Sequence, residues 1–209
     1  MAASFFVGGV MKSWFSKVAR VLGVVAIAAT LAGCGVNNIP TKEEQAKAAW
    51  ADVQSQYQRR ADLIPNLVAT VQGFAKQEKD VLIAVTEARA SATQPKFDAT
   101  TITDPAKFKE FQEAQAQLTG VLGRLLAISE NYPDLKSNQN FLALQSQLEG
   151  TENRISVARR DYNEAVRVYN TELRTFPGSI WAATFYRGNK PIEPFAAAAG
   201  ADKAPEVKF

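Results

Sequence analysis

Hydrophobic side chains recur every seven residues between residues 42 and 92. From Trp50 onward, one position of this repeat is apolar except at Glu78, and the position three residues later is apolar except at Arg60. Two apolar positions per heptad form a stripe along one side of a helix, as in helices that pack side by side. The segment is therefore predicted to be helical, with a stripe made of Trp50, Val53, Tyr57, Ile64, Leu67, Val71, Phe74, Val81, Val85 and Ala88.

A proline interrupts this first helical segment. Pro65 lacks a backbone N–H and crowds the preceding turn, so we expect the helix to be kinked or broken there. The heptad register is the same on both sides of Pro65, so both halves are expected to face one core.

A second helix is predicted after a loop. Residues 93–103 have the Pro, Asp and Thr content of a loop, and Asp104-Pro105 is typical of an N-cap followed by proline at the first helical position. The helix is expected to run to about Glu130, where Asn131-Tyr132-Pro133-Asp134 ends it. Its predicted inward face comprises Phe108, Phe111, Leu118, Val121, Leu125 and Ile128.

The third helix, predicted from about residue 137 to 175, has the most regular pattern. Large apolar residues recur every seven positions, and the companion position is mostly small, which lets neighbouring helices interlock. The two positions comprise Phe141, Leu148, Ile155, Tyr162, Tyr169 and Phe176, and Leu144, Thr151, Ala158 and Ala165.

These blocks predict an all-α fold. We expect an antiparallel bundle of three long helices over residues 42–187, counted as four if the first breaks at Pro65. Pro177-Gly178 ends the third helix, and residues 188–209 are expected to be a flexible tail. The aromatic segment between them has two open interpretations: it closes the end of the bundle, or it docks on a partner or a bilayer. Its aromatic residues, with one from the expected tail, are Trp181, Phe185, Tyr186 and Phe195.

An uncharged apolar run precedes the helical blocks. Three basic residues, the last of them Arg20, come before residues 21–31, and Leu31-Ala32-Gly33-Cys34 follows directly. A basic segment, a short apolar segment and small residues form an export signal, and the last four residues resemble the lipobox of bacterial lipoproteins. That resemblance implies cleavage after residues 1–33, fatty acyl chains such as palmitate on Cys34, and a linker up to residue 41. Met11 is an alternative start.

The alternative for this run is an uncleaved, single-pass anchor in the inner membrane. The apolar stretch 21–36 has 16 residues before polar residues follow. A spanning helix needs about 20. The length therefore favours the lipoprotein, and both interpretations place residues 42–187 on the same, periplasmic side.

The amino-acid composition limits the kinds of binding site and catalytic site that the chain can form. The chain has 24 basic and 21 acidic residues, and residues 1–33 hold three of the basic ones and none of the acidic ones. The remainder is neutral, so no positive field favours nucleic acid as a partner. The chain has no histidine, and no thiol remains once Cys34, its one cysteine, is lipidated, so Cys/His metal sites, Cys or His nucleophiles and Ser-His-Asp arrangements are excluded. We therefore predict no cofactor and no metal.

Several segments resemble signatures of the bacterial LemA family. The resemblance covers roughly residues 40–187 and implies a membrane-anchored helical bundle facing away from the cytoplasm, with no established enzymatic activity. Many relatives carry an uncleaved helix where this chain has a lipobox. The matching segments are Tyr57–Val68, Asn131–Lys136, Phe141–Gln145, Leu148–Ile155, Ala158-Arg159, Tyr162-Asn163, Tyr169-Asn170 and Phe176-Pro177.

Polar residues inside these signatures are the candidate site. We favour a polar network between helices that fixes their register, and a partner-binding or metal-binding patch is the alternative. Glu149 and Asn153 are four residues apart and share a helix face. A buried charge without a partner is costly, so Arg60 is expected to pair with this network unless it faces water. The candidates are Arg60, Asp62, Glu149, Glu152, Asn153 and Arg154.

The favoured function is a membrane-tethered, non-enzymatic module that interacts with an unidentified envelope protein. Its predicted partners are membrane lipid through Cys34 and that protein, and the regular heptads are compatible with a homo-oligomer. Two alternatives stay open. One is a lipid-binding or membrane-remodelling protein. The other is a carboxylate-dependent hydrolase, which requires a converging pair such as Glu149 and Lys136 in one pocket.

Overall fold

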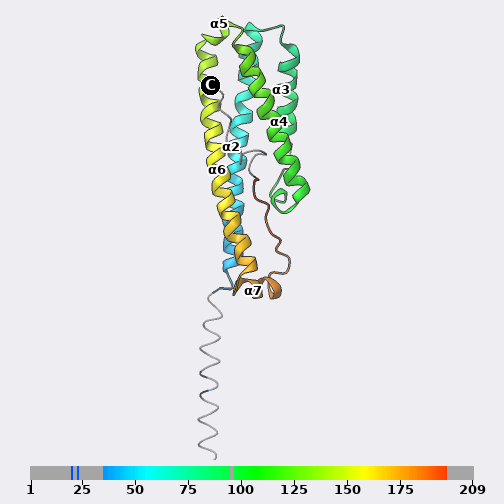
Figure 1. Ribbon diagram of the computed structural model, residues 1–209, viewed down its shortest axis with the longest axis vertical. Coiled ribbons are helices and arrows are strands. Elements are labelled where there is room, and N and C mark those ends of the chain that lie inside the picture. The colour runs from blue at the N-terminus through cyan, green and yellow to red at the C-terminus, as the bar shows by residue number, and fades with distance from the viewer. Residues whose placement is uncertain (1–19, 21–22, 24–34, 95–96, 197–209) are drawn as a thin grey trace, which may run out of the picture.

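The protein is built from long helices that run along one axis (Figure 1). A computed structural model describes residues 20, 23, 35–94 and 97–196. These residues form helices and connecting segments without a strand, which confirms the predicted all-α class. The helices are α2 (Asn38–Phe74), α3 (Lys79–Ala92), η1 (Thr101–Thr103), α4 (Pro105–Ser129), α5 (Pro133–Lys136), α6 (Gln139–Arg174) and α7 (Gly178–Thr184).

Local sequence signals explain where the helices begin. The Asp104 side chain accepts hydrogen bonds from the backbone N–H groups of Ala106 (3.0 Å) and Lys107 (3.2 Å), with Pro105 in the first turn of α4. The predicted N-cap is therefore confirmed. Asn138 caps α6 in the same way, by accepting from the backbone N–H of Phe141 at 3.1 Å.

Of the kink or break predicted at Pro65, the break does not occur. The helix α2 continues through Pro65 to Phe74, and the chain turns only at residues 75–78, before α3 begins. Pro65 is exposed, whereas Ile64 and Leu67 beside it are buried. The missing backbone bond thus lies on the solvent side, and burial of the stripe on both sides of Pro65 holds one helix together.

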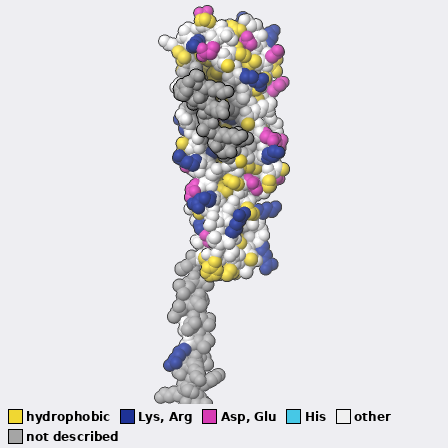
Figure 2. All heavy atoms as spheres, viewed as in Figure 1, with side chains coloured by type: hydrophobic (Ala, Val, Ile, Leu, Met, Phe, Trp, Pro, Cys, Tyr) yellow, Lys and Arg dark blue, Asp and Glu magenta, His cyan; other side chains and the backbone are white. Residues whose placement is uncertain are grey.

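The helices form two regions with different cores. In the four-helix region, at the top of Figure 1, α3 and α4 lie beside the upper halves of α2 and α6. In the stalk region, α2 and α6 continue together towards α7, and an extended segment, residues 189–196, returns along them (Figure 1). We call this segment the strap. Figure 2 shows basic and acidic side chains interspersed on the face in view, without a large field of one sign.

The strap occupies part of the segment that was predicted to be a flexible tail. Residues 188–196 were expected to be flexible, but Ile192 (2% exposed) and Phe195 (6% exposed) belong to the core of the stalk region. Residues 197–209 lie outside the described residues, as do 1–19 and 24–34, so the expected signal peptide is not described.

Most of the predicted inward residues are buried, with two clear exceptions. Phe74, at the end of α2, is 42% exposed, and Phe176, beyond the end of α6, is 81% exposed. Both lie where their helix ends and no neighbour covers the stripe. No helix among the described residues is both long enough and apolar enough to cross a bilayer.

Candidate functional site

A half-open groove of about 430 Å³ lies between α4 and α6, with α2 as its floor. The end of the strap closes one side of it. Apolar surface and hydrogen-bonding groups share the lining, which comprises Tyr57, Arg60, Gln112, Glu113, Gln115, Ala116, Thr119, Glu152, Ile155, Arg159, Phe195 and Ala196.

A buried arginine forms the floor of this groove. The Arg60 side chain is 1% exposed, and its Nη1 donates to Glu152 Oε1 (2.8 Å) and Thr119 Oγ1 (2.9 Å). Its Nη2 donates to Gln115 Oε1 at 2.6 Å, and the guanidinium lies 5.0 Å from the centre of the Tyr57 ring. The charge thus meets groups from α2, α4 and α6, as the cost of burying an unpaired charge requires.

Gln115 extends this network to α3, the third helix that packs beside α2. Its Nε2 donates to the backbone carbonyl of Ala92 at 3.0 Å, so one side chain joins α4 to the end of α3. Gln115 was not identified from the sequence. The signal was present, because Gln115 lies between Phe111 and Leu118 at helical spacing and is a polar residue within an apolar stripe.

The predicted polar residues do not form one cluster. Arg60 and Glu152 meet, as described above, but Asp62 accepts a hydrogen bond from Gln58 (2.7 Å) on the exposed surface of α2. Glu149 accepts from Gln145 (3.2 Å) along α6. Asn153 and Arg154 line a separate cavity with Asp52, Gln56 and other residues of α2 and α6. Leu31, Ala32, Gly33 and Cys34 lie outside the described residues.

Glu78, the other interruption of the first stripe, has a partner outside this network. The Tyr132 hydroxyl donates to Glu78 Oε1 at 2.7 Å, which links the turn between α2 and α3 to the start of α5. This hydrogen bond raises the pKa of Tyr132 above its usual value, because the protonated hydroxyl is the donor.

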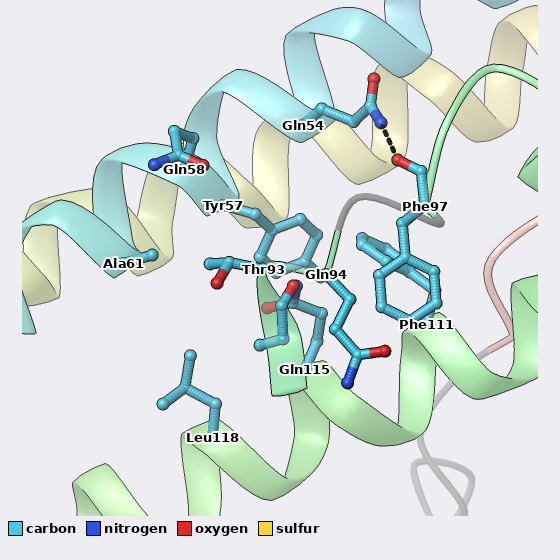
Figure 3. A pocket seen from close by; sticks show the side chains of 11 residues that line it. Gln54, Tyr57, Gln58, Ala61, Thr93, Gln94, Phe97, Phe111, Gln115 and Leu118 are labelled. Atoms are coloured by element: carbon cyan, nitrogen blue, oxygen red, sulfur yellow. Dashed lines mark hydrogen bonds between the residues drawn. The ribbon is translucent and has the colours of Figure 1, made fainter. Parts of the chain in front are cut away.

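A second cavity, of about 180 Å³, lies on the other side of Tyr57, where α2 and α4 meet the end of α3 (Figure 3). The Gln54 Nε2 donates to the Phe97 carbonyl at 2.9 Å, and the Tyr57 and Phe111 rings meet edge to face at 5.3 Å. Burial raises the pKa of Tyr57, the one titratable side chain in this lining. The described residues of this lining therefore offer amide and hydroxyl groups and no acid–base pair.

Two asparagines of α6 hold the strap by its backbone. Asn163 donates from Nδ2 to the Phe195 carbonyl (3.0 Å) and accepts from the Phe195 N–H (2.8 Å). Asn170, seven residues later, makes the same pair of bonds with the carbonyl (2.8 Å) and N–H (3.0 Å) of Ile192. The amide side chains thus take the place that a neighbouring strand has in a sheet.

Two tyrosines reinforce the strap from the adjacent helix positions. The Tyr162 hydroxyl donates to the Glu193 carbonyl (2.7 Å), and the Tyr169 hydroxyl donates to the Lys190 carbonyl (3.2 Å). On its other edge the strap pairs with η1, because the Glu193 N–H donates to the Ile102 carbonyl at 2.8 Å. In the sequence, these Tyr-Asn pairs belong to the family resemblance and the tyrosines to the helix stripe, and neither pattern predicts that the pairs hold the strap.

The pair suggested for a hydrolase does not converge. Lys136 forms an ion pair with Glu130, whereas Glu149 accepts from Gln145 on a different helix. Among the described residues, no group of three or more Asp, Glu, Cys or His side chains is placed to hold a metal ion.

Comparison with known proteins identifies relatives over most of the chain. Magnetosome protein MamQ 2 of Paramagnetospirillum magneticum (strain AMB-1) is 29% identical over 194 residues, which cover 85% of this chain and 70% of the relative. Magnetosome protein MamQ of Magnetospirillum gryphiswaldense is 26% identical over 191 residues, covering 84% and 69%. Protein LemA of Metamycoplasma hominis is 23% identical over 140 residues, covering 67% and 60%.

The match to a family model also covers the strap. The model described as the LemA family matches residues 49–209, which include the Arg60 network, the groove between α4 and α6 and both Tyr-Asn pairs. The resemblance found in the signatures is therefore confirmed, and the chain belongs to the LemA family.

Proposed function

We propose that the protein is a non-enzymatic interaction module that binds an extended segment of another envelope protein in the groove between α4 and α6. The observation that carries this proposal is the strap, because one face of α6 already holds an extended backbone through side-chain amides. The strap reaches the groove at Ala196, so the groove continues the same path.

The groove supplies the chemistry for a polar, extended ligand. Gln112, Glu113 and Arg159 line it along the two helices, and Arg60 lies at its floor. Arg159 stacks 4.4 Å from the centre of the Phe195 ring, which places a cation at the end where the strap enters. Such a surface offers both donors and acceptors, which main-chain recognition requires.

We further propose that the module is tethered to the periplasmic face of a membrane. Membership of the LemA family supports a membrane-associated, non-catalytic helical protein. The signal-like residues 1–33 and Cys34 support a lipoprotein, and a single-pass anchor is the alternative. In either case the groove faces the same compartment as the rest of the body.

Site-specific crosslinking tests the groove. The full chain, expressed in its host, carries a photoreactive amino acid either at Ala116, which lines the groove, or at Gln117, the next residue of α4, which is exposed outside it. We expect a protein adduct of defined mass from the Ala116 position and none from the Gln117 position, because the two side chains point about 100° apart around the helix.

A matched pair of arginines checks that the adduct depends on the groove. Arg159→Ala removes a groove side chain, whereas Arg160→Ala changes its exposed neighbour, which pairs with Asp161. We expect Arg159→Ala to reduce the Ala116 adduct at least several-fold and Arg160→Ala to leave it unchanged. Equal adducts from Ala116 and Gln117, or no adduct from Ala116, would overturn the proposal.

A further inference from the structure

The end of the molecule at α7 exposes large apolar side chains. Phe176 is 81% exposed, Phe185 is 70% exposed and Ile180 is 49% exposed. The first and second flank α7, and the third lies within it. Figure 2 shows hydrophobic side chains gathered at the lower end of the described body, where Figure 1 places α7.

This end is a fixed scaffold. Glu172 near the end of α6 pairs with Lys42 and accepts from Asn38 Nδ2 (3.3 Å), which ties the start of α2 to the end of α6. Gly178 then packs against Glu172 so closely that a Cβ at this position would collide with the Glu172 carbonyl oxygen. The apolar side chains therefore project from a braced end of the bundle.

The N-terminal apolar run joins the body at this same end. Gly35 is buried against α7, where an added Cβ would lie 3.3 Å from Trp181 Nε1 and 3.4 Å from Pro177 Cγ. Cys34 is bonded to Gly35, so any lipid on Cys34, or any membrane helix formed by the apolar run, is attached one residue before the contact of Gly35 with Pro177 and Trp181.

The chain segment that contains α7 carries only basic charged residues between Glu172 and Glu193. Residues 173–192 contain three basic residues, Arg174, Arg187 and Lys190, and no acidic residue. All three are exposed. Aromatic side chains surrounded by cations suit the boundary between anionic headgroups and acyl chains, where rings enter the bilayer and cations meet phosphates.

We propose that the α7 end is a membrane-docking surface that inserts Phe176, Ile180 and Phe185 into the bilayer to which the chain is tethered. Single exposed apolar residues are ordinary on a protein surface. Here three gather on one short segment, beside the attachment point and within a basic stretch, and a phospholipid surface matches all three features.

Docking at α7 orients the module. The helix α6 has 36 residues and runs from α5 to this end. At ~1.5 Å per residue it is about 54 Å long. A docked α7 end therefore holds the four-helix region several tens of ångströms from the bilayer. Docking at α7 rests on the proposed membrane tether but not on the groove, because it involves other residues and a lipid ligand.

Fluorescence quenching by lipids tests the proposal. The full chain, with an environment-sensitive fluorescent amino acid in place of Phe185, is reconstituted in phosphatidylcholine–phosphatidylglycerol vesicles that carry a nitroxide on the acyl chain. The control positions are Leu142, which is 48% exposed at the other end of α6, and Asn37, an exposed polar residue at the start of α2.

We expect acyl-chain nitroxides to quench the Phe185 probe at least three-fold more than the Leu142 and Asn37 probes. Quenching of the Phe185 and Asn37 probes to the same extent would mean that the tether alone brings this end near the membrane, and docking would be overturned. No quenching at Phe185, with association between copies instead, would assign the surface to a second copy and would likewise overturn the proposal.

The basic residues give an independent readout. Arg174→Gln with Arg187→Gln is expected to reduce quenching of the Phe185 probe about two-fold in anionic vesicles and to leave it unchanged in pure phosphatidylcholine. An equal effect in both vesicles would contradict the charge argument. Because both side chains are exposed, the thermal unfolding midpoint serves as the control for folding.

Discussion

The hydrophobic cores of the four-helix region and the stalk region are built from different kinds of side chain. The four-helix core is mainly aliphatic, with Leu67, Val85, Leu118 and Leu125 among its buried residues. The stalk core is mainly aromatic and includes Trp50, Phe97, Phe108, Phe111, Tyr162, Tyr169 and Phe195. Four helices enclose a core that small branched side chains fill. In the stalk, α2 and α6 are covered only by the start of α4, the segment with η1 and the strap, and large rings fill the space and exclude water.

The strap is what completes the stalk core. Trp50 lies 5.0–6.2 Å from four ring centroids, and one of these rings, Phe195, belongs to the strap. The backbone of the strap then needs partners, because a buried segment without a neighbouring strand leaves its N–H and C=O groups unpaired. Asn163 and Asn170 supply them. Side chains of α6 thus pair with the backbone of the strap, as the edge strand of a sheet would.

The largest expected difference between the regions comes from deleting one core side chain in each. Trp50→Ala is expected to cost about 4–5 kcal/mol and Leu125→Ala about 3 kcal/mol in the free energy of unfolding, because the tryptophan leaves the larger cavity among rings. Urea denaturation of the full chain measures both. Limited proteolysis sharpens the comparison, since only Trp50→Ala is expected to expose the strap. Equal costs with no change in cleavage would contradict the division into two cores.

The next effect concerns the polar network where the two regions meet. Gln115→Leu removes the Oε1 acceptor of Arg60 Nη2, which keeps only the 3.4 Å bond to the backbone carbonyl of residue 115, and it leaves the Ala92 carbonyl without its side-chain donor, so we expect a cost of about 2–3 kcal/mol. Arg60→Met removes the charge and the cost of burying it but leaves the buried Gln115 Oε1 without a donor, so we expect a smaller cost of about 1–2 kcal/mol. Denaturation curves for both variants measure and compare these changes in the free energy of unfolding. A larger loss for Arg60→Met than for Gln115→Leu would show that the ion pair stabilises the fold.

A smaller effect confined to the stalk is expected when the strap loses one ladder bond. Asn163→Asp keeps an acceptor for the Phe195 N–H and loses the donor to the Phe195 carbonyl, which we expect to cost about 1–2 kcal/mol locally. Hydrogen exchange is the measurement: amide protection at Ile192 and Phe195 should fall, while protection in α3 stays unchanged. Loss of protection in both regions would mean that they unfold as one unit.

The smallest effect is a difference in alkaline stability. Burial raises the pKa of Tyr162 above the usual value of about 10. Above pH 10 the unfolded chain therefore releases this proton while the folded chain retains it, so stability falls as the pH rises. Between pH 10 and 11 we expect the free energy of unfolding to fall by about 1 kcal/mol more in the native chain than in Tyr162→Phe. Equal slopes in denaturation at both pH values would contradict a buried, protonated Tyr162.

Much of the helical framework could be predicted because it depends on local patterns. The heptad stripe identified Trp50, Leu118 and Tyr162 as core residues, and the cap at Asp104 followed from two adjacent residues. The prediction that Arg60 needs a partner rested on the cost of a buried charge, and the structure pairs it with Glu152. These predictions succeed because each depends either on residues that are close in sequence or on one energetic cost, that of burying an unpaired charge.

The tertiary structure alone decided what depends on distant parts of the chain. The position of the turn at residues 75–78, rather than at Pro65, follows from packing on both sides of that proline. The burial of Phe195 in a segment expected to be a tail, and the use of Asn163 to hold it, depend on contacts across 32 residues. A helical pattern shows which face of a helix is apolar, but only the folded chain decides what covers that face and where the cover ends.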